Sequence, residues 1–82
     1  MSMERAQFLG QREELRVKST RLEAGIHALR HSVRTMLNPF VEIEDINAVE
    51  MHAQAYELSE KIQEYKEIRL KIKAISKELG GR

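Results

Sequence analysis

The stretch MLNPFVEIED, residues 36–45, contains the only proline of the 82-residue chain, and the sequence reads as helix on both sides of it. Pro39 cannot continue a helix, because its ring removes a backbone N–H and clashes with the preceding turn. It also disfavours helical geometry at the residue before it, Asn38. The stretch therefore predicts the point where one long helix ends and the chain turns back.

The break divides the chain into segments in a simple order: helix one over residues 2–37, an apolar turn over 38–44, helix two over 45–79 and a Gly-Gly stop over 80–82. Asp45 is the expected N-cap of helix two, because its carboxylate can accept the unpaired N–H groups of a first turn. Helices of roughly 50 Å joined by so short a link favour an antiparallel pair. The predicted fold class is all-α, a single antiparallel hairpin.

A seven-residue apolar period runs along each predicted helix, which is the pattern of a packing seam. The seam residues are Phe8, Leu15, Leu22, Leu29 and Met36 in helix one and Met51, Leu58, Tyr65, Ile72 and Leu79 in helix two. The apolar positions beside the second seam change sides along it, from Ala48, Ala55 and Ile62 to Ile68 and Ile75. We therefore predict a local change of coiled-coil phase near Tyr65.

Helix two is also apolar on nearly the opposite side from its seam, next to the turn. One partner helix cannot cover both sides, so we expect a second chain to pack there. We favour a homodimer in which two antiparallel hairpins form a four-helix bundle. The predicted self-association interface is Leu29, Val33, Met36, Phe40, Ile46, Val49, Ala53 and Tyr56. A different protein partner is the alternative.

The turn is apolar where turns are usually polar, with Phe40, Val41 and Ile43 close together. Large apolar residues in such a place are more often the lid of a core or a dimer contact than a dedicated docking knob. We interpret the turn as structural.

Charge is distributed unevenly although the formal net charge is only +1. Residues 1–21 and 61–82 together carry 12 basic and six acidic side chains, whereas residues 22–60 carry two basic and seven acidic ones. An antiparallel dimer would place the basic open end of one hairpin against the acidic turn of the other. Within one hairpin, two charged edges predict ion pairs that fix the register. The arginine edge on helix one is Arg5, Arg12, Arg16, Arg30 and Arg34, and the glutamate edge on helix two is Glu50, Glu57, Glu60, Glu64, Glu67 and Glu78. The predicted pairs are Arg5–Glu78, Arg16–Glu67, Glu23–Lys61 and Arg34–Glu50.

The competing interpretation of the basic open end is contact with the phosphates of a nucleic acid. The candidate contact residues are Arg12, Arg16, Lys66, Lys73 and Lys77. Interleaved acidic residues and the scarcity of aromatic stacking groups at that end weigh against it. Nucleic-acid binding is therefore the alternative to a protein-interaction function.

The sequence offers little catalytic chemistry. It has no cysteine, no glycine-rich phosphate loop and no serine with an evident base. His27 and His31 share a helix face as zinc ligands can, but they are expected to point away from helix two and from His52. We expect no enzyme activity, no metal and no cofactor, and a metal site that His27 and His31 form across subunits is the weaker alternative. No segment has the length of a signal peptide core or a membrane span, so we expect a cytoplasmic adaptor, assembly factor or small regulator.

Overall fold

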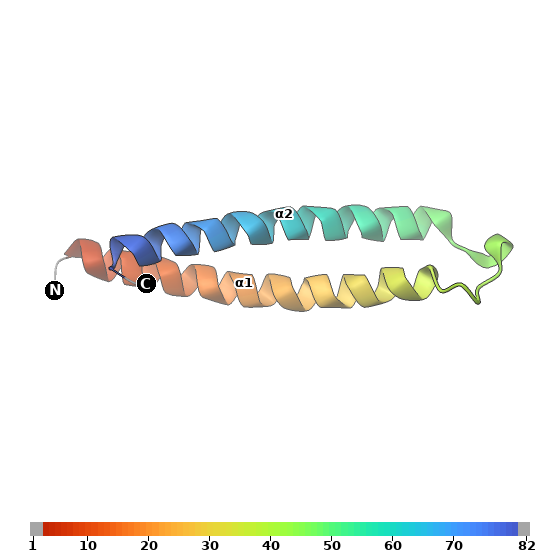
Figure 1. The fold of residues 1–82 in the computed structure, drawn as a ribbon, viewed down its shortest axis with the longest axis horizontal. Coiled ribbons are helices and arrows are strands. Elements are labelled where there is room, and N and C mark those ends of the chain that lie inside the picture. Colours follow the sequence, from red (N-terminus) through yellow and green to blue (C-terminus); the bar gives the residue numbers. More distant parts are fainter. Residues whose placement is uncertain (1–2, 81–82) are drawn as a thin grey trace.

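The structure, a computed structural model, describes residues 3–80. Within this range two long helices, α1 (Met3–Met36) and α2 (Ala48–Glu78), run antiparallel, and the turn between them contains a short 3-10 helix, η1 (Ile43–Asp45). The rod measures 62 × 20 × 14 Å (Figure 1). Both described ends lie together, and we call this end of the rod the open end. The predicted all-α hairpin is confirmed.

The proline break ends α1 as predicted. Leu37 still donates its backbone N–H to the Val33 carbonyl at 3.0 Å, but the helical ladder stops before Pro39. The side chain of Asn38 then accepts the Phe40 N–H at 2.9 Å, which is the local bond that asparagine makes in turns. The loss of one donor at Pro39 and the side-chain acceptor at Asn38 together redirect the chain.

The prediction that Asp45 caps helix two is wrong. Asp45 lies in η1, where its N–H donates to the Glu42 carbonyl at 2.9 Å. α2 begins after this extra turn, and its N-cap is Asn47, whose side-chain oxygen accepts the Glu50 N–H at 3.1 Å. The turn is therefore longer than residues 38–44.

Gly80 follows the C-terminal end of α2. Gly80 has φ +76°, a left-handed conformation that suits glycine at the end of a helix. Its N–H donates to the Lys77 carbonyl at 3.0 Å, which closes the last turn of α2. Residues 81–82 of the predicted stop lie outside the described residues.

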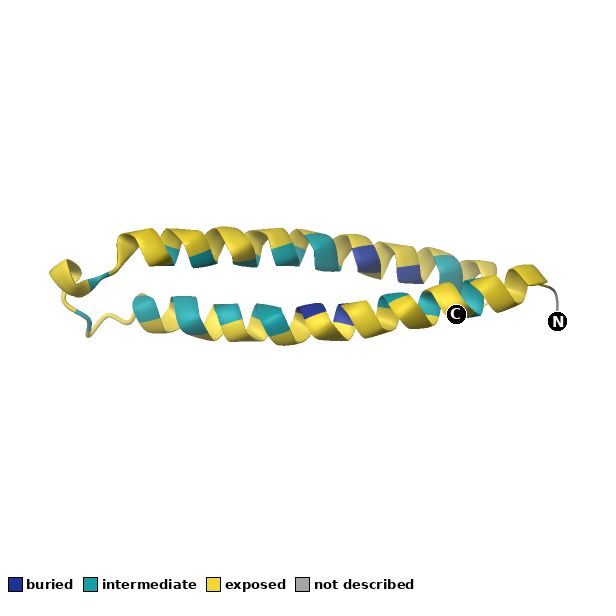
Figure 2. Ribbon diagram, turned by 180° about the vertical axis from the view of Figure 1, so that it is seen from behind, coloured by how far each residue is buried: buried dark blue, intermediate teal, exposed yellow. Residues whose placement is uncertain are grey.

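The two predicted seams face each other. Their residues are half-buried or buried, and the buried hydrophobic residues of the described chain are Leu22, Ile68 and Ile72 (Figure 2). Leu15, Ile26 and Tyr65 pack around these three residues. So small a core indicates that a single hairpin leaves much of its apolar surface in water.

The predicted change of phase near Tyr65 does not occur. Ala48 and Ala55 are exposed, although Ile62 is half-buried. The companion positions on the other side of the α2 seam are half-buried or buried along its whole length, at Gln54, Lys61, Ile68 and Ile75. The two companion positions nearest the turn, Gln54 and Lys61, are polar, so the pattern of apolar residues alone did not reveal that the seam is regular. A seven-residue stripe stays against its partner helix over this length only when the two helices wind slightly around each other, because a straight helix turns such a stripe by about 20° per seven residues.

Candidate functional site

The structure divides the predicted self-association interface into two parts. Leu29, Val33 and Met36 are half-buried in the α1 seam, where they face α2 of the same chain. Phe40, in contrast, is 92% exposed in the turn. Ile46 is half-buried just before α2. Only part of this set is therefore open to a second molecule.

The outward side of α2 carries an apolar stripe that α1 does not touch. Val49, Tyr56 and Leu70 are 82%, 61% and 66% exposed, and Gln63 completes their seven-residue spacing. We call these four residues the outer stripe; the exposed Ala53 lies beside it. Sequence reasoning missed Leu70, although its spacing from Val49 and Tyr56 was the available signal. The outer stripe is a nearly straight line opposite the α2 seam.

The apolar residues of the turn do not cover the core of this chain. Phe40 and Ile43 are 92% and 87% exposed, and only Val41 among the three predicted lid residues is half-buried. Within one chain the interpretation of the turn as a lid is therefore wrong. A contact with a second molecule would still bury Phe40 and Ile43.

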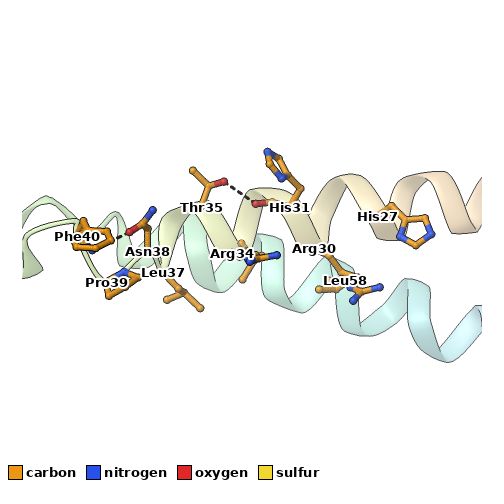
Figure 3. A pocket seen from close by; sticks show the side chains of 11 residues that line it. His27, Arg30, His31, Arg34, Thr35, Leu37, Asn38, Pro39, Phe40 and Leu58 are labelled. Carbon is orange, nitrogen blue, oxygen red and sulfur yellow. Dashed lines mark hydrogen bonds between the residues drawn. The ribbon is translucent and has the colours of Figure 1, made fainter.

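A hollow of about 950 Å³ lies on α1 beside the turn (Figure 3). Its basic side chains are His27, Arg30, His31 and Arg34, and its apolar ones include Val33, Leu37, Phe40 and Leu58. Figure 3 shows that His27 and His31 project from α1 at different places, and His52 does not line the hollow. Among residues 3–80, no three His, Cys, Asp or Glu side chains are grouped closely enough to hold a metal ion.

Arg12 and Arg16 of the arginine edge lie on the flank opposite Glu64 of the glutamate edge, and among the described residues three of the four predicted ion pairs are not formed. Lys18 forms an ion pair with Glu64 of the glutamate edge at 3.6 Å. Arg16 is turned from Lys18 by about 160° around α1 and lines a groove with Arg69 on the other flank. Within residues 3–80 the predicted pairs Arg16–Glu67, Glu23–Lys61 and Arg34–Glu50 are not formed.

Glu23 interrupts the arginine edge and has a different partner from the one predicted. The Tyr65 hydroxyl donates to its carboxylate at 2.8 Å. This hydrogen bond, followed by the partial burial of the phenol and the nearby negative charge, raises the pKa of Tyr65 above its ordinary value of 10.0. The contact joins the two helices on the arginine flank.

A second, smaller hollow of about 400 Å³ runs between the helices near the open end, and we call it the open-end groove. Its cationic lining is Arg12, Arg16, Arg69, Lys73 and Lys77. Four of the five predicted polyanion contacts thus lie together, whereas Lys66 does not line the groove. Arg69 was missed because its place opposite Arg16 depends on the rotation of α2. No carboxylate lines this groove in the described part of the chain.

No protein-family model, curated protein or solved structure matches this chain. In the part of the chain that the structure describes, neither helix has a stretch long and apolar enough for a membrane crossing. Function must therefore be inferred from the exposed surfaces of the hairpin.

Proposed function

We propose that the protein is a non-enzymatic interaction module, a small adaptor, assembly factor or regulator that works as a homodimer of hairpins. The observation that carries the proposal is the exposed outer stripe of α2. Three large apolar side chains in a line on an otherwise charged helix are typical of a helix-packing surface. The small core of the hairpin gives a reason for it, because a second chain would bury apolar area that one chain cannot.

Charge supports a second copy of the same chain as the occupant. Residues 45–60 carry four acidic and no Lys or Arg side chains, whereas residues 61–77 carry six basic and two acidic ones. Two α2 helices packed antiparallel would place the acidic half of each against the basic half of the other. A parallel pair would place like charges together, which opposes association.

The spacing of the outer stripe supports the same arrangement. With Gln63 on the two-fold axis, Tyr56 of one chain lies level with Leu70 of the other, and each Val49 lies level with the aliphatic stem of Lys77. An isologous interface of this kind is closed, so association stops at the dimer. Phe40 and Ile43 remain at the ends of the assembly, where a further protein could contact them.

Cysteine crosslinking tests the interface and its direction, because the chain has no cysteine of its own. We expect Gln63→Cys to form a disulfide-linked dimer under mild oxidation, since residues on the axis approach their own copies. Val49→Cys is the matched control on the same stripe. In the antiparallel dimer it lies far from its copy and stays unlinked.

A link at both positions would indicate a parallel dimer and contradict the proposed order of the hairpins. A link at neither position, in a chain that remains helical by circular dichroism, would contradict the outer stripe as a self-association surface. Non-denaturing gel filtration of the linked species separates a true dimer from larger aggregates.

A further inference from the structure

The two flanks of the hairpin differ in how their charged side chains are arranged. On one flank Lys18 of α1 faces Glu64 of α2 in an ion pair of 3.6 Å. On the other flank, in the open-end groove, Arg16 of α1 and Arg69 of α2 line the same hollow with no carboxylate between them. Arg12 donates one N–H to the Ser76 hydroxyl at 3.5 Å, which is a weak neutral contact.

Glu23 lies on the same flank, but its carboxylate accepts from Tyr65 and does not line the groove. Arg16 and Arg69 therefore share the groove without an ion pair that would help the hairpin to fold. Like charges across a helix pair oppose packing, and a glutamate at either position would form a flanking pair instead. Lys73 and Lys77 add to the positive charge of the same groove. A concave surface lined by one sign of charge concentrates ions of the other sign. The groove is thus suited to an anion that comes from outside the chain.

We propose that the open-end groove binds the phosphodiester backbone of double-helical nucleic acid, independently of base sequence. Arg12 and Arg16 on α1 and Arg69, Lys73 and Lys77 on α2 stand at one-turn intervals of about 6 Å, so they form two short rows of cations. Such rows match a regular line of phosphates, and arginine can bind each phosphate through two N–H groups. Beyond Glu23, which interrupts the arginine edge, Arg30 and Arg34 lie on the same side of α1, and the distance along the helix from Arg12 to Arg34 is about 33 Å.

The lining favours a nucleic-acid backbone over the other anionic partners. Its one apolar residue, Ile72, is only 5% exposed, so the groove offers no exposed apolar side chain to anchor a peptide or to insert into a membrane. It also has no aromatic side chain, which single strands require for stacking on their bases. The groove forms inside one chain, so the inference does not need the proposed dimer, although the dimer would also bring Val49 of the second chain level with the groove residue Lys77.

Fluorescence anisotropy with labelled RNA and DNA duplexes of equal length tests the proposal on the full chain. We expect binding to at least one duplex, with an affinity that falls steeply between about 0.05 and 0.2 M salt. The double variant Arg16→Glu/Arg69→Glu should bind at least about tenfold more weakly and lower the salt slope by about two. Comparison of the two duplexes identifies which backbone the groove prefers.

The control is Arg21→Glu/Lys71→Glu, which makes the same change in net charge at exposed positions on the opposite flank. We expect this variant to keep most of the affinity. An equal loss in both double variants would overturn the groove as a site, because only total charge would then matter. If either Glu variant loses its helical signal, the corresponding Arg→Gln and Lys→Gln pairs replace it.

The single variant Arg16→Glu separates binding from a structural role. It places a carboxylate opposite Arg69, so we expect a higher Tm together with weaker duplex binding. A lower Tm would show that Arg16 supports the fold, and the proposal would fail. It would also fail if the native chain bound neither duplex, or bound vesicles rich in phosphatidylserine while ignoring both.

Discussion

Two residues near the start of α2, Asp45 and Asn47, are almost equally good candidates for its N-cap. Asp45 and Asn47 both have side-chain oxygens that can accept the N–H groups of a first turn. The structure uses Asn47, because residues 43–45 form a 3-10 turn of their own and leave Asp45 inside it. Sequence reasoning could locate the break at Pro39 but not this short turn, whose stability depends on two backbone hydrogen bonds.

The hydrogen bond between Tyr65 and Glu23 makes the stability of the folded chain depend on pH. Because the folded chain holds the Tyr65 pKa above 10.0, the bond stabilises the fold fully below pH 10.0 and less as the pH rises through the folded pKa. We expect Glu23→Gln to lower the Tyr65 pKa. The measurement is a tyrosinate absorbance titration in a Tyr56→Phe background, where Tyr65 is the only tyrosine.

The comparison is made between two chains that both carry Tyr56→Phe, one with Glu23 retained and one with Glu23→Gln. We expect the tyrosinate transition of Tyr65 at a lower pH in the Glu23→Gln chain, provided that both chains remain helical over the range. Identical Tyr65 midpoints in the two chains would contradict the role given to the carboxylate.

At the scale of the element, the seams of both helices contain polar residues at places where an apolar one would pack better. Arg12 and Ser19 occupy companion positions in α1, and Gln54 and Lys61 occupy them in α2. Near the turn the apolar neighbours of the seam include Ala48 and Ala55, which are exposed, and for this reason the apolar pattern predicted a change of phase. The helix boundaries and the main seven-residue stripes were predictable because they depend only on local pattern and on Pro39.

Gln54 offers a test of how the polar seam positions affect stability. It is half-buried, and its side-chain carbonyl oxygen has no hydrogen-bond partner, although its amide donates to Glu50 at 2.8 Å. An acceptor removed from water without a partner is destabilising. We expect Gln54→Met, which keeps the length of the side chain, to stabilise the hairpin by about 1 kcal/mol.

Thermal unfolding followed by circular dichroism measures this change. Gln11→Met is the matched control, because Gln11 is exposed on α1 and the same substitution should shift the stability by less than about 0.5 kcal/mol. A lower Tm for Gln54→Met than for the native chain would show that the Gln54–Glu50 bond outweighs the unpaired oxygen.

For the whole molecule, the rotation of each helix about its own axis decides which surfaces the hairpin presents. A few contacts around Leu22, Ile68 and Ile72 fix this rotation. They place Arg16 of the arginine edge on the flank opposite Glu64 of the glutamate edge. The sequence revealed both edges but not their relation, and it therefore predicted ion pairs within the hairpin. A basic groove on one flank and an apolar stripe on the outer side of α2 are properties of the assembled pair.

The proposed dimer depends on the outer stripe. The contribution of the stripe to dimer formation is best measured by the solution mass of the chain. Tyr56→Asp/Leu70→Asp places two charges in the stripe without touching the seam between α1 and α2. These side chains are exposed in one chain, so the variant should keep its helical content as a monomer. The pair therefore separates association between chains from folding within a chain.

The most direct test of the dimer is the solution mass of the native chain by size-exclusion chromatography with light scattering, over a range of concentrations. We expect twice the 9.6 kDa mass of one chain, and a single-chain mass for Tyr56→Asp/Leu70→Asp with unchanged helicity. A helical native chain that stays at 9.6 kDa, or a dimer that the two aspartates leave intact, would contradict self-association through the outer stripe.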